Sequence, residues 1–418
     1  MKSSKKLRHL GALLVVLALV ATACGDDDAT TTTSGPDGGA AAPFTATFGY
    51  VLPQTGGLAS IADALIKPLE MANEEITAAG DTLTLIPTDS GTDAAIATTA
   101  VEGLLNQNVS AIIGPAATGV SLAVIDRITG ASVPMCSPSN TGAIFTTYED
   151  NGFYFRTAPP DNLQGKVHAD MITADGATRV AVAYRSDEYG RGLAESIRDN
   201  LVANGVEVPE FIEFDKDGTS FDAEAAQIAA AGVDAVSFIP FAEGAAFLQA
   251  LIEAGVGPDD VAVYTADGFV DNVKAADVDP DDPAVLEGVR ATYPSVAPPS
   301  GEPTFPDRFA AFAPDAPLVF SAHAYDCIII FALAAVAAGS TDPVAIQAQV
   351  NAVTRNGVNC NRYAECRDLL LAGENIDYDG ASGTLDFVEA GEPGAGTYTL
   401  LTYNAEGDQD VDATVDVP

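Results

Sequence analysis

The stretch Ala111-Ile-Ile-Gly-Pro-Ala-Ala-Thr-Gly-Val-Ser121 decides the fold. It starts as a short apolar strand, passes through a glycine-containing loop and enters a helical pattern that runs to Ile128. A second apolar strand, Val133–Cys136, follows directly. Strands that are apolar throughout and alternate with helices form parallel sheets whose two faces are both covered. The stretch therefore predicts a doubly wound α/β sheet.

The same alternation continues along the chain and falls into two series. In the first series we expect strands at 44–52, 82–86, 111–114 and 133–136 and helices at 60–79, 92–105 and 121–128. In the second series we expect helices at 162–173, 188–204, 222–230 and 244–253 and strands at 179–184, 206–214, 235–239 and 261–264. Each series can build its own sheet, and 418 residues suffice for two domains. The chain therefore predicts two α/β lobes.

Proline-rich segments mark the places where the chain crosses between the lobes. Arg156-Thr-Ala-Pro-Pro160 is a stiff, extended segment, and Tyr293-Pro294 with residues 297–301 is typical of a return crossing. The apolar run Ile328–Ala338 is too short to cross a bilayer about 30 Å thick, so we expect a buried helix there.

The first 23 residues have the pattern of an export signal. Basic residues between Lys2 and Arg8 precede the apolar run 10–20, which is too short to span a membrane. Small residues lead to Cys24, the arrangement of a bacterial lipoprotein whose cysteine carries the lipid. We therefore expect a signal peptide at 1–23, an acylated Cys24 with a flexible tether at 24–43, and a lipoprotein on the extracytoplasmic face of the cell membrane. An ordinary secretory signal that leaves Cys24 free is the alternative.

The composition disfavours several classes of protein. There are 59 Asp and Glu against 19 Lys and Arg, and a net charge of −40 repels nucleic acids and anionic lipid headgroups. Three histidines are too few for a multi-histidine metal site, and no catalytic motif is present. Val120 stands where a phosphate-binding loop needs lysine. We therefore predict a protein that is not an enzyme, has no cofactor or metal, and binds no nucleic acid.

Two loops at strand ends are rich in hydroxyl groups. Thr118 and Ser121 follow the strand at 111–114, and the segment Cys136–Gly142 follows the strand at 133–136. Ligands of doubly wound sheets bind at the carboxyl ends of strands, where helix N-termini favour anions. Hydroxyl groups without a lysine or arginine suit a carboxylate better than a phosphate. The alternative is that both loops are ordinary caps and turns.

Three loops of the second series carry acidic and aromatic residues. These loops are Tyr184–Gly190, Phe241–Gly244 and Ala266–Gly268. A carboxylate among them could bind an ammonium group, and the aromatic rings could wall the pocket. Taken one at a time, each loop is better explained as a helix-capping turn.

Residues 44–418 resemble the type I periplasmic-binding-protein fold, in particular the Leu/Ile/Val-binding branch that serves ATP-binding-cassette importers. The resemblance rests on the order of motifs along the chain, namely Gly49–Gly56, Ile113–Pro115, Val133–Thr141, Phe153–Thr157, Asp187–Leu193, His323–Asp326 and Tyr378–Gly383. It implies two doubly wound parallel-sheet lobes joined by three crossings. Lobe I is then expected at 44–158 plus 293–373, and lobe II at 159–292 plus 374–418.

The resemblance also implies a site. The carboxylate and ammonium of an amino acid are held by the positions that match Thr118, Ser139, Thr141, Tyr189 and Asp267, and Phe241 lies near the ligand's side chain. Asp267 departs from the family's pattern because the usual residue is a glutamate.

The function implied is capture of a small solute and its delivery to an ATP-binding-cassette permease. An aliphatic or branched-chain amino acid, or a related amide, is the expected ligand, and the protein is expected to be a monomer. Two alternatives remain open. One is a ligand sensor or receptor of the same fold, and the other is a binder of an amide such as urea.

Four cysteines follow Cys24. Cys360 and Cys366 lie close together in a polar stretch and predict a disulfide in an oxidising compartment. Cys136 ends a strand and Cys327 opens an apolar helix, which favours two buried free thiols.

Overall fold

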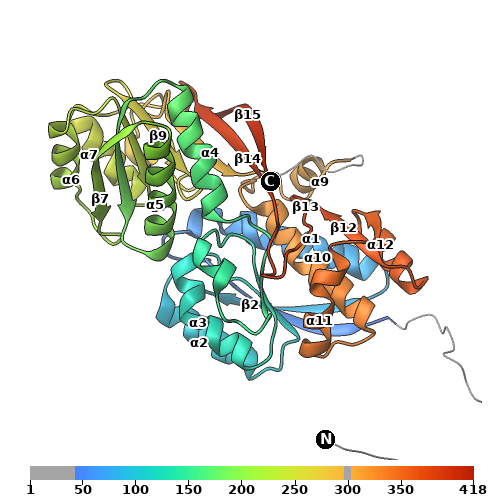
Figure 1. Ribbon diagram of the computed structural model, residues 1–418. Helices are drawn as coiled ribbons and strands as arrows, with labels where there is room; N and C mark the ends of the chain where they lie inside the picture. The colour runs from blue at the N-terminus through green and yellow to red at the C-terminus, as the bar shows by residue number, and fades with distance from the viewer. Residues whose placement is uncertain (1–42, 296–302) are drawn as a thin grey trace, which may run out of the picture. The chain divides into compact units, whose positions relative to one another are not determined.

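The computed structural model describes residues 43–295 and 303–418 (Figure 1). All of these residues belong to one structural unit of the chain, residues 40–418. The expected signal peptide, Cys24 and almost all of the expected tether lie outside the described residues, as does the crossing expected at 297–301.

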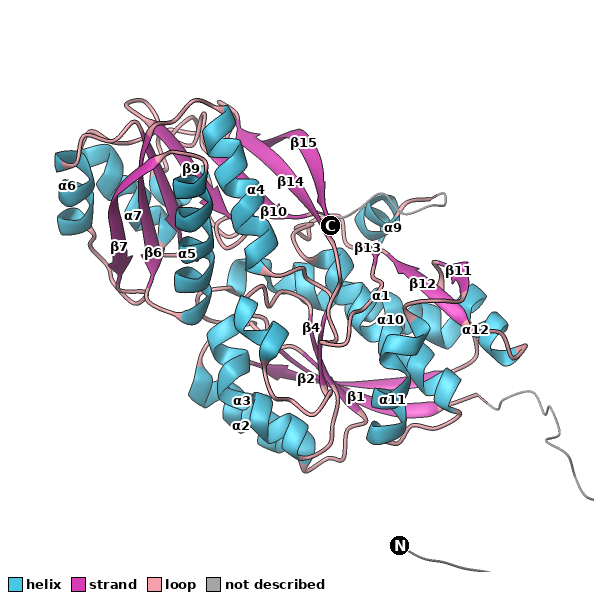
Figure 2. Ribbon diagram, in the orientation of Figure 1, coloured by secondary structure: helices cyan, strands magenta, loops and turns pink. Residues whose placement is uncertain are grey.

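The first lobe is built on a five-stranded parallel sheet in the order β2-β1-β3-β4-β5. Figure 2 shows α2 and α3 together on one side of this sheet, with α1 and α10 on the other. The central strands β3 and β4 are buried along their whole length, as expected of strands covered on both faces. The elements are β1 Thr45–Leu52, α1 Ala62–Ala78, β2 Thr82–Asp89, α2 Ala94–Leu105, β3 Ala111–Ile113, α3 Thr118–Gly130, β4 Met135–Ser137 and β5 Tyr154–Arg156.

The second lobe is built on a seven-stranded sheet in the order β15-β14-β10-β9-β8-β6-β7. Strands β6 to β10 are parallel to one another, and the hairpin β14–β15 adds an antiparallel edge. The predicted α/β architecture with two doubly wound sheets is confirmed, and the hairpin is an addition to it. The elements are α4 Asp161–Ala174, β6 Arg179–Arg185, α5 Glu188–Ala203, β7 Glu207–Phe214, α6 Asp222–Ala230, β8 Ala235–Ile239, α7 Gly244–Glu253, β9 Ala262–Ala266, α8 Ala275–Val278, β10 Arg290–Pro294, β14 Gly396–Tyr403 and β15 Gln409–Val417.

The remaining elements complete the first lobe, and they place the last crossing later than expected. Strand β12 packs against α10, α11 and α12, and Tyr378 on it donates a hydrogen bond to the buried Asp326 at 2.7 Å. The expected boundary at residue 373 therefore disagrees with the contacts, because the chain enters the second sheet only at Gly396. The expected boundary at residue 293 also disagrees with the structure, because Tyr293 belongs to β10 of the second sheet. The elements are α9 Phe305–Phe312, α10 Ser321–Ala338, α11 Pro343–Val353, β11 Val358–Cys360, α12 Tyr363–Leu371, β12 Ile376–Gly380 and β13 Gly383–Thr384.

Helix α10 is the core helix of the first lobe. Within the described ranges it is the one helix long and apolar enough to cross a membrane, and 83% of it is buried inside the protein. Its Asp326 accepts hydrogen bonds from Tyr378, Ala381 and Ser382, so this buried carboxylate is fully used. The predicted buried helix at residues 328–338 is confirmed.

Two disulfides are present, one of which was expected. The predicted Cys360–Cys366 disulfide is confirmed. The prediction of two buried free thiols was wrong, because Cys136 and Cys327 are joined, with 5.7 Å between their Cα atoms. The two residues are 191 positions apart, and only the packing of α10 against the end of β4 brings them together.

A buried ion pair ties the first crossing to the last. Arg156 is 0% exposed, and its Nε donates to Glu392 at 2.8 Å while Nη2 pairs with the same carboxylate. Its Nη1 also donates to the backbone oxygens of Asn140 and Gly142, at 3.1 and 2.9 Å. One guanidinium therefore holds both crossings and the loop after β4 in place.

We expect the Arg156→Met variant to lose about 3–5 kcal/mol of unfolding free energy, because the carboxylate of Glu392 remains buried without its partner. Urea unfolding followed by circular dichroism measures the loss. The matched control is Arg127→Met, which breaks an exposed pair with Glu102 and should cost about 0–1 kcal/mol. Equal losses in the two variants would contradict the structural role of Arg156.

We expect the two disulfides to differ in their contribution to stability. In the chain-entropy model, a cross-link over 191 residues contributes about 5 kcal/mol and one over 6 residues about 2 kcal/mol. Removing Cys136 and Cys327 together, as alanines, should therefore destabilise the protein more than removing Cys360 and Cys366 together. Unfolding of both double variants in urea checks the order, and the reverse order would refute it.

Candidate ligand-binding site

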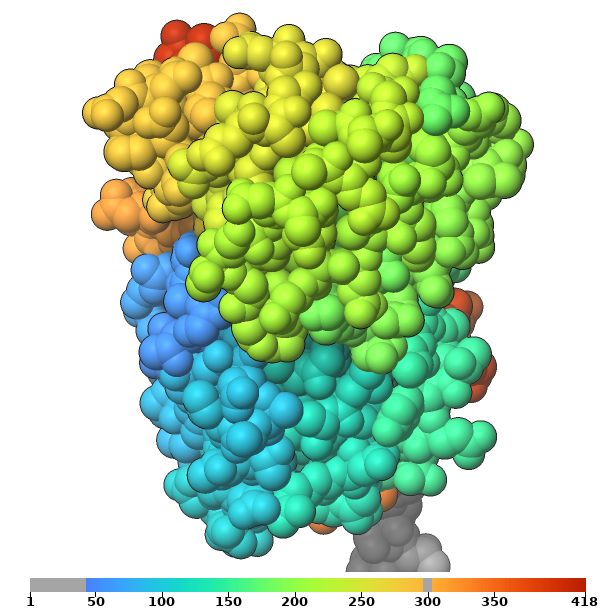
Figure 3. Space-filling view, turned by 90° about the vertical axis from the view of Figure 1, so that its left-hand side faces the viewer, coloured from blue at the N-terminus to red at the C-terminus, as the bar shows by residue number. Residues whose placement is uncertain are grey.

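A small cavity lies where the two lobes meet. Its volume is about 20 Å³, which is room for about one water molecule. On the face shown in Figure 3, residues of the second lobe (green to yellow) lie directly on those of the first (blue to cyan). The lining comprises Leu58, Ile61, Ala116, Ala117, Thr118, Ser139 and Phe320 from the first lobe and Tyr189, Phe241, Asp267 and Gly268 from the second. Both lobes thus contribute predicted site residues to one cavity.

The wall from the first lobe contains the N-terminus of α3. This helix has 13 residues and begins at Thr118, and its N-cap residue Ala117 offers no side-chain acceptor to the free N–H groups. Thr118 Oγ1 accepts a hydrogen bond from the Gly142 N–H at 3.3 Å, so its own hydroxyl hydrogen is left for another acceptor. Ser139 Oγ donates to the Ala116 carbonyl at 3.1 Å and keeps its lone pairs. This end of the cavity therefore favours a negatively charged group.

Hydrogen bonds join the two hydroxyl-rich loops, which follow β3 and β4. Ser137 Oγ donates to the Pro115 carbonyl at 2.7 Å, and Asn140 Nδ2 donates to the Ala116 carbonyl at 2.6 Å. Ser121 also donates to Pro115, at 3.2 Å, so its hydroxyl is used inside the loop. Ser121 and Ser137 are therefore structural, whereas Thr118 and Ser139 reach the cavity.

Aromatic rings form the wall from the second lobe. The rings of Tyr189 and Phe241 are stacked, with centroids 5.2 Å apart. The guanidinium of Arg185 lies over the Phe241 ring, 3.7 Å from its centroid, and forms ion pairs with Asp187 at 2.7 Å and Glu243 at 2.6 Å. This arginine is fully engaged, so the wall is rigid and offers no free positive charge to a ligand.

Asp267 supplies the negative charge of the cavity. Its Oδ1 accepts from Gln164 Nε2 at 2.6 Å and from Tyr189 Oη at 3.3 Å. Burial raises the pKa of the Asp267 carboxyl to about 6, although these two hydrogen bonds lower it. No lysine, arginine or histidine in the described part of the chain forms an ion pair with Asp267. This buried carboxylate therefore lacks a cationic partner, which a group from outside the protein can supply.

Thr141 does not line the cavity. Its backbone oxygen accepts from the Asp161 N–H at 2.7 Å, at the start of α4. Its hydroxyl is buried and has no hydrogen-bond partner among the described residues. Of the six residues predicted to bind the ligand, Thr141 is the one that the structure places behind the wall.

Sequence reasoning missed several residues at or behind this wall. Gln164 lies in the helix expected at 162–173, where no pattern singles it out, and it is fully buried and donates a hydrogen bond to Asp267. Phe320 has a left-handed backbone, with φ of 57°, just before α10, and no local pattern marks such an aromatic residue. Leu58 and Ile61 are apolar residues in a region expected to be loop or helix start.

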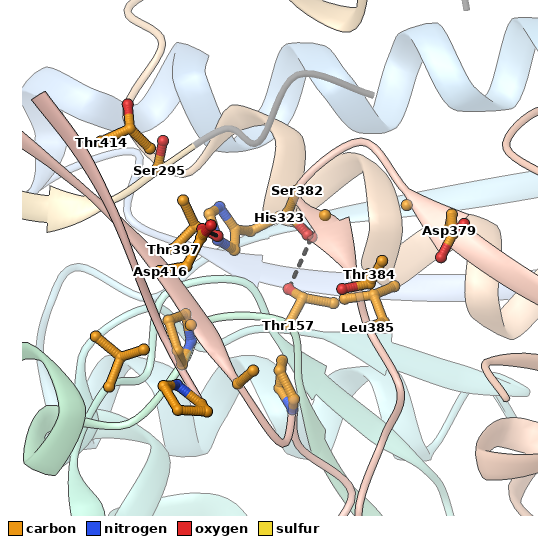
Figure 4. A pocket seen from close by; sticks show the side chains of 18 residues that line it. Thr157, Ser295, His323, Asp379, Ser382, Thr384, Leu385, Thr397, Thr414 and Asp416 are labelled. Carbon is orange, nitrogen blue, oxygen red and sulfur yellow. Dashed lines mark hydrogen bonds between the residues drawn. The ribbon is translucent and has the colours of Figure 1, made fainter. Parts of the chain in front are cut away.

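A second, larger cavity of about 770 Å³ lies beside the crossings, and Figure 4 shows its lining. Thr157 Oγ1 donates there to the His323 carbonyl at 2.9 Å. Burial lowers the pKa of His323 to about 3, so this histidine is neutral. None of the predicted ligand-binding residues lines this cavity. Over residues 43–295 and 303–418 no group of three or more His, Cys, Asp or Glu side chains is placed to hold a metal ion.

Comparison with known proteins finds relatives that are 25–29% identical to this chain. An uncharacterised protein of Methanocaldococcus jannaschii is 29% identical over 40% of this chain and 42% of its own length. Leu/Ile/Val-binding protein homolog 3 of Brucella melitensis is 27% identical over 52% of this chain and 60% of its own length. The matches thus span about half the length of these two relatives. The chemotactic substrate-binding protein BasB of Halobacterium salinarum is 26% identical over 84% of this chain and 85% of its own length.

Solved structures with the same fold cover nearly the whole described chain. The leucine-binding protein LivK of Thermotoga maritima has a TM-score of 0.73 at 22% identity, over 89% of this chain and 99% of its own. LivJ of Streptococcus pneumoniae, in complex with isoleucine, has a TM-score of 0.72 at 22% identity over the same shares. A solute-binding protein of R. palustris in complex with benzoate has a TM-score of 0.72 at 17% identity, over 88% and 96%.

The family model described as periplasmic binding protein matches residues 45–408. Together with the relatives named for Leu/Ile/Val binding and the shared architecture, this match confirms the predicted resemblance. The chain therefore belongs to the periplasmic binding protein family, and its fold is that of the leucine-binding protein LivK and of LivJ, to which it is similar.

Proposed function

We propose that this protein binds an aliphatic or branched-chain amino acid between its lobes and delivers it to an ATP-binding-cassette permease. The observation that carries the proposal is the pairing of opposite polarities in one cavity. The N-terminus of α3, with Thr118 and Ser139, suits a carboxylate, and Asp267 on the other lobe suits an ammonium group. An amino acid zwitterion has both groups.

The rest of the lining supports a ligand with an apolar side chain. Leu58, Ile61 and Phe320 from the first lobe and Phe241 from the second present apolar surface to the cavity. Burying such a side chain against them contributes about 1.5–3 kcal/mol to binding. Similar proteins named for leucine and isoleucine binding agree with this choice.

The size of the cavity requires that the lobes part before the ligand enters. A space that holds about one water molecule cannot hold an amino acid. Because the walls come from two lobes joined only by crossings, a hinge movement opens the cavity without unfolding either sheet. The ligand then stabilises a closed state in which both of its charges are desolvated.

The place of action follows from the family and from the N-terminal segment. Membership of the periplasmic binding proteins supports an extracytoplasmic location, and two disulfides agree with an oxidising compartment. We infer that the signal peptide at 1–23 is removed and that Cys24 carries a lipid which holds the monomer at the membrane.

A second candidate function is ligand sensing. BasB, similar over 84% of this chain, is named as part of a chemotactic signal transduction system. A sensor and an importer share the same cavity, so binding alone does not separate them. Uptake of radiolabelled leucine by membrane vesicles with and without this protein does, because only the importer role predicts uptake that depends on it.

We expect leucine and isoleucine to raise the melting temperature of the purified protein in a thermal-shift screen. A ligand at 100 times its dissociation constant adds about 2.7 kcal/mol to the folded state. The screen includes all amino acids, urea, acetamide and benzoate. A shift with benzoate or an amide, and with no amino acid, would refute the proposed ligand class while keeping the solute-binding role.

We expect Asp267→Asn to weaken leucine binding by about 1–3 kcal/mol, because the hydrogen bond to the ammonium group then comes from a neutral amide oxygen and not from a carboxylate. Binding of 4-methylpentanoate, which is leucine without its ammonium group, should not weaken. Isothermal titration calorimetry measures both affinities. The control Asp259→Asn changes the net charge equally at an exposed position and should alter neither affinity. Equal losses for both ligands would remove Asp267 from the ammonium role.

A further inference from the structure

The larger cavity beside the crossings has walls from both lobes. Thr157 on the first crossing, Ser295 after β10 and Gly396 at the start of β14 all line it (Figure 4). Strand β12 of the first lobe and strand β15 of the second lobe also contribute residues. Its volume of about 770 Å³ lies within the range of sites that bind small organic molecules.

A buried imidazole with an unpaired nitrogen belongs to this wall. His323 is 2% exposed, and its Nδ1 has no hydrogen-bond partner among the described residues. Figure 4 shows its ring on the side of the cavity where Thr397 and Asp416 lie. The ring is neutral, because burial lowers its pKa to about 3, so one nitrogen accepts and the other donates. A buried polar atom without a partner costs free energy, and a hydrogen-bonding ligand would remove that cost.

The charged groups of the described lining are all negative. Asp379 on β12 is half-buried and Asp416 on β15 is exposed, and neither takes part in an ion pair within the described structure. Asp379 accepts a hydrogen bond from Asn359 Nδ2 at 2.7 Å, and Asp416 accepts one from Thr397 Oγ1 at 2.8 Å. Each carboxylate therefore keeps lone pairs for another donor. Two carboxylates from different lobes attract a solute that carries positive charge.

Other classes of ligand fit this lining less well. An anion would meet two carboxylates and no lysine or arginine among the described lining residues. A metal ion would lack ligands, because the described part of the chain has no group of three or more His, Cys, Asp or Glu placed to hold one. An aromatic solute would find no phenylalanine or tyrosine to stack on. The lining therefore favours an aliphatic organic cation.

We propose that this cavity is a second ligand site, which binds a small aliphatic diamine or polyamine through Asp379, Asp416 and His323. Ammonium groups of the ligand pair with the carboxylates of the two lobes, and a ligand N–H donates to the imidazole. Leu385 and Pro393 offer apolar surface to the methylene chain between the amines. This inference goes beyond the proposed function and does not depend on which solute binds between the lobes.

The two cavities are neighbours, so a test must tell them apart. Phe320 lines the smaller cavity, and its ring contacts the ring of His323 edge-on, with centroids 5.6 Å apart. The smaller cavity has an acidic residue of its own, Asp267, which could also pair with an amine. An amine that binds in the larger cavity should depend on Asp379 and Asp416 and not on Asp267.

Isothermal titration calorimetry of the purified protein with putrescine, which is 1,4-diaminobutane, tests the inference. We expect one putrescine to bind per chain, and added salt to weaken the binding. Asp379→Asn and Asp416→Asn should each lower the affinity by about two- to fivefold, as for charge pairs that stay in contact with water. The uncharged analogue 1,4-butanediol should not bind measurably.

Two control variants accompany these. Asp410→Asn removes the same charge from the same strand, β15, at an exposed position outside the lining. Asp267→Asn removes the carboxylate of the smaller cavity. Both should bind putrescine as the wild type does.

A further variant, His323→Leu, tests the imidazole. It removes both ring nitrogens at similar volume, and the unpaired Nδ1 leaves no hydrogen bond to lose. We therefore expect an unchanged melting temperature without ligand and an affinity for putrescine that is about two- to tenfold lower. If this variant does not fold, the two aspartate variants decide.

Several outcomes would overturn the inference. Putrescine that does not bind at millimolar concentration overturns it, and so does 1,4-butanediol that binds equally well. Equal losses in Asp410→Asn and Asp416→Asn would show only the general attraction of an acidic protein for amines. A loss in Asp267→Asn without one in Asp416→Asn would place the amine in the smaller cavity. None of these results bears on leucine binding, so the proposed function is tested separately.

Discussion

The buried guanidinium of Arg156 is the constraint on which the rest of the structure depends. It holds Glu392 from the last crossing and the carbonyls of Asn140 and Gly142 from the loop after β4. That loop carries Ser139 into the cavity and supports Thr118 through Gly142. The position of the anion-binding wall and the position of the crossings are therefore set by one side chain. A movement of the lobes that kept this group intact would keep the first wall of the site unchanged.

Arg156 is paired with a carboxylate, whereas the site contains a carboxylate without a cationic partner. In a chain with a net charge of −40, the arginines near the cavity are already neutralised by Glu392, Asp187 and Glu243. Asp267 is left without a cation among the described residues, and it is buried. Under the proposed function, the ammonium group of the ligand supplies this cation, which favours charged amines over neutral amides.

Features of the fold and the site could be predicted where they depend on a short stretch of sequence, and could not where they depend on contacts between distant residues. The alternation of apolar strands and helices predicts both sheets, and the carboxyl ends of parallel strands predict which loops could carry a site. The resemblance to a family, and not the spacing, predicted that Thr118, Ser139, Tyr189, Phe241 and Asp267 meet across the two sheets, and it predicted Thr141 with them, which does not line the cavity. Other features depend on contacts between distant residues. Cys136 meets Cys327 through the packing of α10 against the end of β4. Residues 374–384 join the first lobe through the packing of β12 against α10, α11 and α12 and through their hydrogen bonds to Asp326. Gln164 lies in the helix expected at 162–173, and its complete burial is a tertiary effect that the sequence pattern does not show.

The contacts between the lobes indicate how a ligand can control closure. Asn272 Nδ2 donates to the Gly57 carbonyl at 3.0 Å, and the Val319 N–H donates to the carboxylate of Asp271 at 3.4 Å, so two hydrogen bonds join the lobes next to the lining residues Leu58 and Phe320. Each such bond contributes only about 0.5–1.5 kcal/mol, and water replaces it when the lobes part. These two hydrogen bonds therefore add little to the free energy of opening. Under the proposed function, a zwitterion bound between the N-terminus of α3 and Asp267 has both charges desolvated only in the closed state, and this difference shifts the population toward closure.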